Sequence, residues 1–349
     1  MKTLHERLEI IANMAVEWCD PDHPPRAAAV EKTLAAPNRW TDAALEHALN
    51  RWMQCLTVER LTEWLGEERP TASVQVGVLH AETEPIAGLR DALAVWALGH
   101  SYVGHVPNSS PALLPAIAEA LRDRGLNVQA QFTGAEAVYE AAEALVAEPD
   151  SQEEVHEKCE EAGIPGGRRL IRPPVYSVGV VDGHESEDEM GRLAEDMLLY
   201  EGQGRRRLAL LWAPRDHSPD EYLEAMAHFR GLFPAHEDTP GTLQMQQAFL
   251  EARDQPHAYA DGLEFLMSRG EPEVQRAGHV RWTEYDDLED LADWLADRED
   301  AIYSVIARSD LHDRLPAFHT IRTPGGVHVP PLDDREGEET VAFLRGIAA

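Results

Sequence analysis

Apolar positions along most of this chain follow two alternating periods. From about residue 72, short apolar runs of strand length are separated by segments in which apolar residues recur every three or four positions. The strand-like runs are residues 74–79, 101–106, 126–132, a run around Leu145, and 169–171. The helix-like segments are 85–98, 135–142 and 151–162. A further helix is predicted after Ser110, which acts as its cap, with Pro111 as its first residue. Strands that alternate with helices of this length predict βαβ units and a parallel sheet.

The alternation starts again after the double proline Pro173-Pro174. Strands are predicted at 175–181, 208–213, 280–285 and 301–307, and helices after capping boxes at Ser186 and Ser218, at 288–296 and at 340–347. Residues 234–280 carry no clear period. We therefore predict a helical segment over 1–66, a first α/β domain over 67–173 that 330–349 completes, and a second α/β domain over 174–329.

One loop between a predicted helix and a predicted strand combines glycines with arginines. It reads Tyr200-Glu201-Gly202-Gln203-Gly204-Arg205-Arg206-Arg207-Leu208, which we call the arginine loop. Its three guanidinium groups and turn N–H groups indicate either a seat for phosphate, carboxylate or coenzyme A, or a set of surface ion pairs. A second basic group, Arg168, Arg169 and Arg172, has the same two interpretations.

Charge sets the class of environment and partner. The 349 residues include 31 Lys+Arg against 63 Asp+Glu, a formal net charge of -32, and the lysines are Lys2, Lys32 and Lys158 alone. A surface so rich in carboxylates predicts a halophilic source, because high salt screens the self-repulsion. It excludes nucleic acid, whose phosphates require a basic surface.

Other sequence features indicate a cytoplasmic protein. No run approaches the roughly 20 apolar residues that span a bilayer, and the first 18 residues do not resemble a signal peptide. Three scattered cysteines predict neither a disulfide framework nor a metal site, and Cys159 is expected to be an ordinary helix cysteine. No metal is expected.

Several short matches give the chain a family resemblance. They are Asn38-Arg39-Trp40-Thr41, Val76-Gly77-Val78, Pro85, Gly88, Asp91, Leu93, Gly99-His100, Leu114-Pro115-Ala116 and Gly202-Gln203-Gly204. With these residues the sequence resembles the fatty acyl-CoA reductases of the bacterial bioluminescence (Lux) type, in the aldehyde dehydrogenase superfamily. The resemblance implies an aldehyde dehydrogenase-like α/β fold with two Rossmann-like domains, the first for a cofactor and the second for catalysis.

The resemblance also implies a chemistry. In that family a thiolate attacks an acyl thioester, and a nicotinamide cofactor then delivers hydride to release an aldehyde. The nucleophile position follows Gly204 and is Arg205 here. Because a guanidinium stays protonated, it excludes thioester attack by this residue.

Three further family positions are also changed. The oxyanion-donor loop corresponds to Ala81–Pro85, where only Thr83 offers a hydroxyl; the ribose-binding lysine becomes His105; and the pyrophosphate turn becomes Glu148, Pro149 and Asp150. Carboxylates and a proline without an N–H oppose phosphate binding. We therefore predict a catalytically silent homologue that binds no cofactor strongly and retains a site for a small anionic metabolite or a protein partner. The alternative is an active NAD(P)H-dependent acyl-CoA reductase or aldehyde dehydrogenase-type oxidoreductase with a rebuilt site, for which NADP is the expected cofactor. Homo-oligomerisation is left open.

Overall fold

The computed structural model describes residues 2–68, 70, 72–80, 82–330, 332 and 334–348. Ala81 of the predicted oxyanion loop and Pro331 lie outside these residues. The chain divides into two compact units, one of residues 1–174 with 330–349 and one of residues 175–329. Within the described ranges no helix is both long and apolar enough to cross a membrane.

The first unit is built on a parallel five-stranded sheet in the order β3-β2-β1-β4-β5. Its strands are β1 Gln75–His80, β2 Ser101–His105, β3 Ala130–Thr133, β4 Ala144–Glu148 and β5 Arg169–Ile171. The order runs outward in both directions from β1, which is the Rossmann arrangement. The predicted parallel α/β fold is confirmed.

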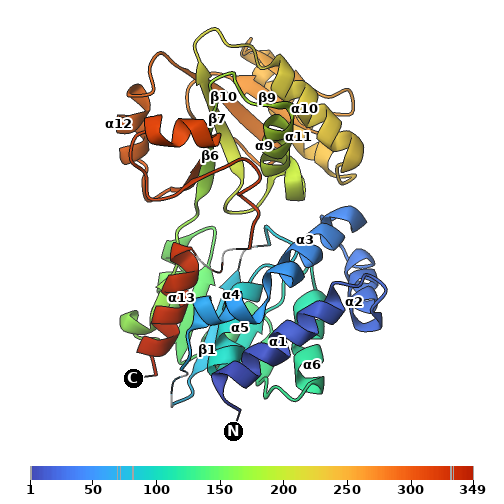
Figure 1. The fold of residues 1–349 in the computed structure, drawn as a ribbon, viewed down its shortest axis with the longest axis vertical. Helices are drawn as coiled ribbons and strands as arrows, with labels where there is room; N and C mark the ends of the chain where they lie inside the picture. The colour runs from blue at the N-terminus through green and yellow to red at the C-terminus, as the bar shows by residue number, and fades with distance from the viewer. Residues whose placement is uncertain are drawn as a thin grey trace. The chain divides into compact units, whose positions relative to one another are not determined.

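The helices of this unit cover both faces of the sheet (Figure 1). They are α1 Leu4–Trp18, α2 Pro24–Leu34, α3 Asp42–Cys55, α4 Val58–Leu65, α5 Leu89–Leu98, α6 Leu113–Asp123, α7 Ala135–Ala141, α8 Gln152–Glu161, the 3₁₀ turn η1 Gly166–Arg168 and α13 Arg335–Gly346. Residues of α7 and α8, including Val138, Val155 and Cys159, pack on Val103 and Leu145 of one sheet face. On the other side α5 lies between the sheet and the outer helices α1 and α13.

Helix α5 is the buried centre of the first unit. Every one of its residues is buried, as expected for a helix that is apolar nearly all round. Its only charged residues are Arg90 and Asp91, in its first turn. Since ionised groups are costly to bury alone, these two require partners.

The second unit contains a seven-stranded sheet in the order β12-β11-β6-β7-β10-β9-β8, in which only the β8–β9 pair is antiparallel. Its elements are β6 Tyr176–Val180, α9 Glu187–Leu198, η2 Leu199–Gly202, β7 Leu208–Pro214, α10 Asp220–Leu232, α11 Thr239–Ala252, β8 His257–Tyr259, β9 Leu266–Arg269, β10 His279–Tyr285, α12 Asp290–Ala296, β11 Ile302–Ile306, η3 Ser309–Arg314 and β12 Ile321–Arg322. Helix α12 covers one face of the sheet, and α9, α10 and α11 cover the other (Figure 1).

Two predicted helix starts are wrong, because each helix begins later in the chain and neither serine forms the predicted cap. Helix α6 begins at Leu113 without a side-chain cap, and the Ser110 hydroxyl instead accepts from the Trp40 indole at 3.2 Å. Helix α10 likewise has no side-chain cap on its first turn, although the Ser218 hydroxyl accepts from the Asp220 N–H at 3.4 Å. The serine cap patterns therefore predicted that these two helices exist but not the residues at which they begin.

Candidate functional site

The parallel sheet of the first unit presents a natural ligand site where its strand order reverses. In open α/β sheets, ligands bind outside the carboxyl ends of the strands at this switch point. Here it lies between β1 and β4, whose last residues, His80 and Glu148, are paired in register. The side chains at this edge therefore decide what the fold can bind.

A cluster of charged and polar side chains occupies this edge, and we call it the carboxyl-edge network. It consists of His80, Arg90, Asp91, Glu148, Arg172, Glu336 and Thr340. The Glu148 carboxylate accepts from Arg90 Nη2 at 2.5 Å and from Arg172 Nη1 at 3.1 Å, and its other oxygen lies 3.0 Å from His80 Nδ1. The Glu148 carboxylate at the end of β4 thus links the end of β1, the residue that follows β5 and the first turn of α5.

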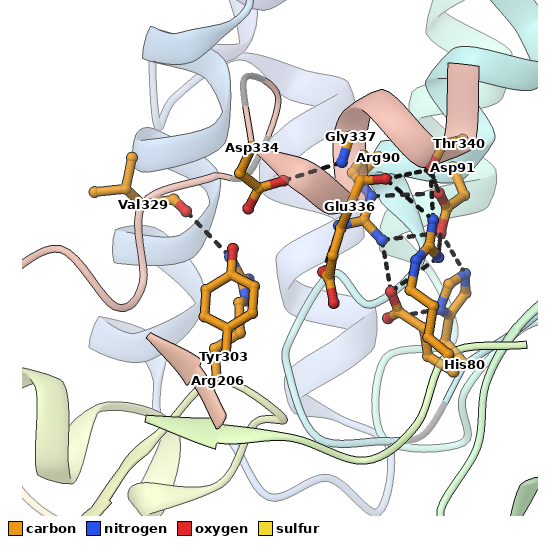
Figure 2. A network of polar contacts seen from close by, with 12 residues as sticks. His80, Arg90, Asp91, Arg206, Tyr303, Val329, Asp334, Glu336, Gly337 and Thr340 are labelled. Atoms are coloured by element: carbon orange, nitrogen blue, oxygen red, sulfur yellow. Dashed lines mark hydrogen bonds and ion pairs between the residues drawn. The ribbon is translucent and has the colours of Figure 1, made fainter. Parts of the chain in front are cut away.

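The last helix of the chain contributes the remaining members of the network (Figure 2). Glu336 accepts from Arg90 Nη1 at 2.9 Å, and the Thr340 hydroxyl donates to Asp91 at 2.7 Å while accepting from Arg172 at 2.6 Å. Arg172 also lies 3.3 Å from Asp91. Asp91 and Thr340 are fully buried. The network is therefore an internal part of the first unit.

Electrostatics in the network favour the charged forms of Asp91 and Arg90. Burial alone raises the pKa of Asp91, but the charges of Arg90 and Arg172 outweigh burial and hold that pKa well below its ordinary value. Burial opposes the charge of Arg90 as well, and the carboxylates of Asp91, Glu148 and Glu336 raise its pKa well above the ordinary value. The ions are thus mutually stabilised.

The residues at this edge do not fit a dinucleotide. A pyrophosphate binds to free N–H groups at the first turn of the crossover helix, where the helix dipole favours negative charge. In this protein the first turn of α5 already holds the buried Asp91, and Glu148 places a second carboxylate at the end of β4. A phosphate bound at this edge would lie close to both carboxylates, which would repel it.

The same cluster is a poor metal site. Ligand atoms of His80, Asp91 and Glu148 lie within 4.8 Å of one another, a spacing that could hold an ion. However, Arg90 and Arg172 already pair with both carboxylates. A divalent cation has to replace two buried guanidinium groups, so we assign no metal here.

The family-equivalent oxyanion position, Thr83, and the family-equivalent cofactor positions lie at or just after strand ends at this edge. Thr83 lies in the loop after β1, His105 ends β2 with Nδ1 3.4 Å from the Thr133 carbonyl, and Glu148 ends β4. Pro149 and Asp150 follow in the turn to α8, and Asp150 is exposed. Of these residues, only Glu148 belongs to the network. The oxyanion role of Thr83 and the loss of strong cofactor binding at His105, Pro149 and Asp150 stay predictions.

Sequence reasoning missed most of the network. Its members His80, Arg90, Glu336 and Thr340 carry no motif, although a charged pair inside the otherwise apolar α5 was a usable signal. The arginines of the second basic group have different partners. Arg172 belongs to the network, whereas Arg169 donates to the Ile164 carbonyl at 2.8 Å. Cys159 is a buried helix cysteine as expected, and burial raises the pKa of its thiol.

The arginine loop of the second unit has an unusual backbone. Tyr200 and Glu201 adopt left-handed φ values of 54° and 61°, and Gly202 and Gly204 follow at 60° and 96°. Two consecutive left-handed residues that are not glycine are rare and store strain. The buried Glu201 is held by Arg230 Nη2 at 3.2 Å and by the Thr239 hydroxyl at 2.5 Å. Tertiary contacts thus impose this conformation.

The arginines of this loop have partners in different segments. Arg206 is buried, donates to the Val329 carbonyl at 3.1 Å and lies 5.8 Å from the centre of the Tyr303 ring (Figure 2). Arg207 donates to the Gln275 carbonyl at 2.8 Å, and Arg205 is half-buried. These contacts account for Arg206 and Arg207 within the fold, and an anion seat formed by Arg205, Arg206 and Arg207 stays a prediction.

Among the comparisons with known proteins, the solved structures identify the fold. No family model matches the sequence, and a search of curated proteins finds no significant match. Among solved structures, the chain is similar to an NAD-dependent benzaldehyde dehydrogenase from Corynebacterium glutamicum, with a TM-score of 0.69 and 13% identity over 97% of this chain and 83% of that chain. It is also similar to an aldehyde dehydrogenase from Mycobacterium tuberculosis complexed with NAD+, with a TM-score of 0.65 and 15% identity over 93% and 78%. The chain therefore has the aldehyde dehydrogenase-like fold.

Proposed function

We propose that this protein is a catalytically silent relative of the Lux-type fatty acyl-CoA reductases, retained to bind a small anionic metabolite or a protein partner. The observation that carries the proposal is the carboxyl-edge network. It fills the switch point between β1 and β4 with buried ion pairs in place of free phosphate-binding groups.

The distribution of possible nucleophiles supports the same proposal. A thiolate enzyme needs an accessible cysteine of low pKa in its catalytic domain. Residues 175–329 contain no cysteine, and the family nucleophile position is Arg205. The three cysteines, Cys19, Cys55 and Cys159, all belong to the first unit. Thiolate attack on a thioester therefore has no cysteine to perform it within residues 175–329.

The proposal is tested by turnover and by binding. With a fatty acyl-CoA and NADPH in concentrated KCl, we expect no acyl-dependent loss of NADPH absorbance, and no rise in melting temperature with NADP. An acyl-CoA reductase active in the same buffer serves as the positive control. Acyl-dependent NADPH consumption by this protein contradicts the proposal.

A second candidate is an active NAD(P)H-dependent reductase with a rebuilt site. The strained arginine loop favours it, because left-handed non-glycine residues cluster at active sites. This candidate predicts that NADPH raises the melting temperature, since a ligand that binds only the folded state stabilises it. The nucleotide titration therefore separates the two candidates.

A further inference from the structure

A pocket in the second unit lies between α11, the loop that connects β9 to β10, and strand β10. Its volume is about 430 Å³, within the range of small-molecule sites. The lining residues include Met245, Gln246, Phe249, Arg253, His279 and Arg281. All of these residues belong to one stretch of the second unit, residues 245–281.

The sheet face beneath α11 is polar where an apolar face is expected. His279, Arg281 and Thr283 alternate along β10 and share one face, and Ser268 of β9 is paired with Arg281. All four residues are buried. A sheet face that packs on a helix normally buries apolar side chains, so these polar groups require another explanation.

Both ring nitrogens of His279 have a polar partner within the protein. Its Nδ1 lies 2.9 Å from the Gln246 amide oxygen, and its Nε2 lies 2.7 Å from the Ser268 hydroxyl. Burial, together with the charges of Arg281 and His257, lowers the pKa of His279 to about 3. The imidazole is therefore neutral near pH 7 and contributes no charge to the pocket.

The guanidinium group of Arg281 has buried nitrogens without a hydrogen-bond partner among the described residues. These nitrogens are Nε and Nη1, and only 4% of the residue is exposed. Burial lowers the pKa of Arg281, and the charge of Glu273 only partly offsets this effect. A buried guanidinium that lacks a carboxylate is unfavourable, and an anion that enters the pocket relieves this cost.

The mouth of the pocket adds an apolar surface and further arginine. Met245 and Phe249 are large apolar side chains with 74% and 53% exposure, and the Arg253 guanidinium stacks 4.0 Å from the Phe249 ring centre. The lining holds three arginines and two glutamates, which leaves a charge of +1 in a chain whose net charge is -32. The pocket is thus a locally cationic site with an apolar rim.

We propose that this pocket binds a small organic anion whose carboxylate or phosphate pairs with Arg281 and whose apolar part lies against Met245 and Phe249. A guanidinium forms two parallel hydrogen bonds to either anion, which gives the site its orientation. The proposal rests on the binding role proposed above and gives that role a place and a ligand class.

The test uses the full chain and calorimetric titration with four probes: octanoate, octyl phosphate, 1-octanol and acetate. We expect octanoate or octyl phosphate to bind at one site per chain, and 1-octanol and acetate to bind at least about tenfold more weakly. The stronger of the two anions identifies the charged group. Equal binding of 1-octanol, or no binding of either octyl anion, contradicts the proposal and leaves Arg281 with water alone.

Matched variants locate the site. Arg281→Leu is expected to weaken anion binding by about tenfold or more and to leave the melting temperature without ligand equal to or above that of the unmodified protein. Arg298→Leu, which removes an arginine stacked on Trp294 outside the pocket, is expected to leave binding unchanged. If Arg281→Leu does not fold, Phe249→Ser on the exposed rim supplies the test through weaker octanoate binding. Unchanged binding in both pocket variants contradicts the proposal, whereas NADPH turnover contradicts only the silent function.

Discussion

Asp91 combines full burial with three kinds of partner, which are two guanidinium groups, a hydroxyl and an imidazole. Arg90, Arg172 and Thr340 contact its carboxylate, and His80 Nε2 lies 3.3 Å away. Loss of one member of a buried ion network leaves its partners uncompensated. We expect Asp91→Asn to lower the free energy of unfolding by about 3–5 kcal/mol, measured by urea denaturation.

Asp188 offers a matched control, because it also lies in the first turn of a helix and pairs with an arginine. Its contact with Arg192 is 2.8 Å, but both side chains are more than half exposed. We expect Asp188→Asn to cost below about 1 kcal/mol. Equal costs for the two variants show that the network contributes no more than a surface ion pair.

The lowered pKa of Asp91 also sets a pH dependence. Because the folded-state pKa lies below the unfolded value of about 3.9, the stabilisation is complete above that value and is lost as the pH falls below it. Between pH 5 and pH 2.5, the free energy of unfolding of the unmodified protein should therefore fall more steeply than that of Asp91→Asn. Parallel profiles count against a charged Asp91 in the fold.

At the scale of elements, the link between α9 and β7 is tightly constrained by its backbone conformation and its close contacts. A Cβ at Gly202 lies 2.7 Å from the Gly278 nitrogen and 2.9 Å from the Met197 carbonyl oxygen, and φ there is 60°. We expect Gly202→Ala to lower the free energy of unfolding by about 2–4 kcal/mol, since both clash and conformation oppose it.

Gly191 is the matched position within α9. A Cβ there has no heavy atom within 4 Å, and its backbone is helical. Gly191→Ala should raise the free energy of unfolding by about 0.5–1 kcal/mol, because alanine loses less entropy in a helix. The same urea assay measures both variants, and a neutral Gly202→Ala shows that the loop relaxes at little cost.

Elements with a strong period could be predicted from the sequence, whereas elements set by context could not. Helix α9 has an apolar stripe and a true capping box from Ser186 and Glu189. Helix α11 and strands β8 and β9 fell in the unassigned stretch 234–280, because α11 has a proline near its start, no side-chain cap and few buried residues. Its buried leucines pack on β9, a contact that local sequence does not encode.

For the whole molecule, the net charge of -32 leads us to expect a stability that depends on salt. With 63 acidic against 31 basic side chains, repulsion within the folded chain falls as salt screens it. We expect the melting temperature to rise between 0.1 M and 2 M KCl, measured by circular dichroism. Replacing the exposed acids Glu153 and Glu157 of α8 by glutamine should reduce this salt dependence. A melting temperature that does not change with KCl contradicts the high-salt hypothesis.

The sequence by itself determined the alternating α/β elements, the acidic character and the absence of cysteine from residues 175–329. The elements could be predicted because the hydrophobic period of a segment shows which of its sides is buried. The acidic character and the cysteine positions are properties of composition alone. Only the tertiary structure decided the polar sites. Asp91 meets Thr340 from 249 positions away, and Arg281 loses its solvent beneath α11, because folding brings distant charges together and removes water from them.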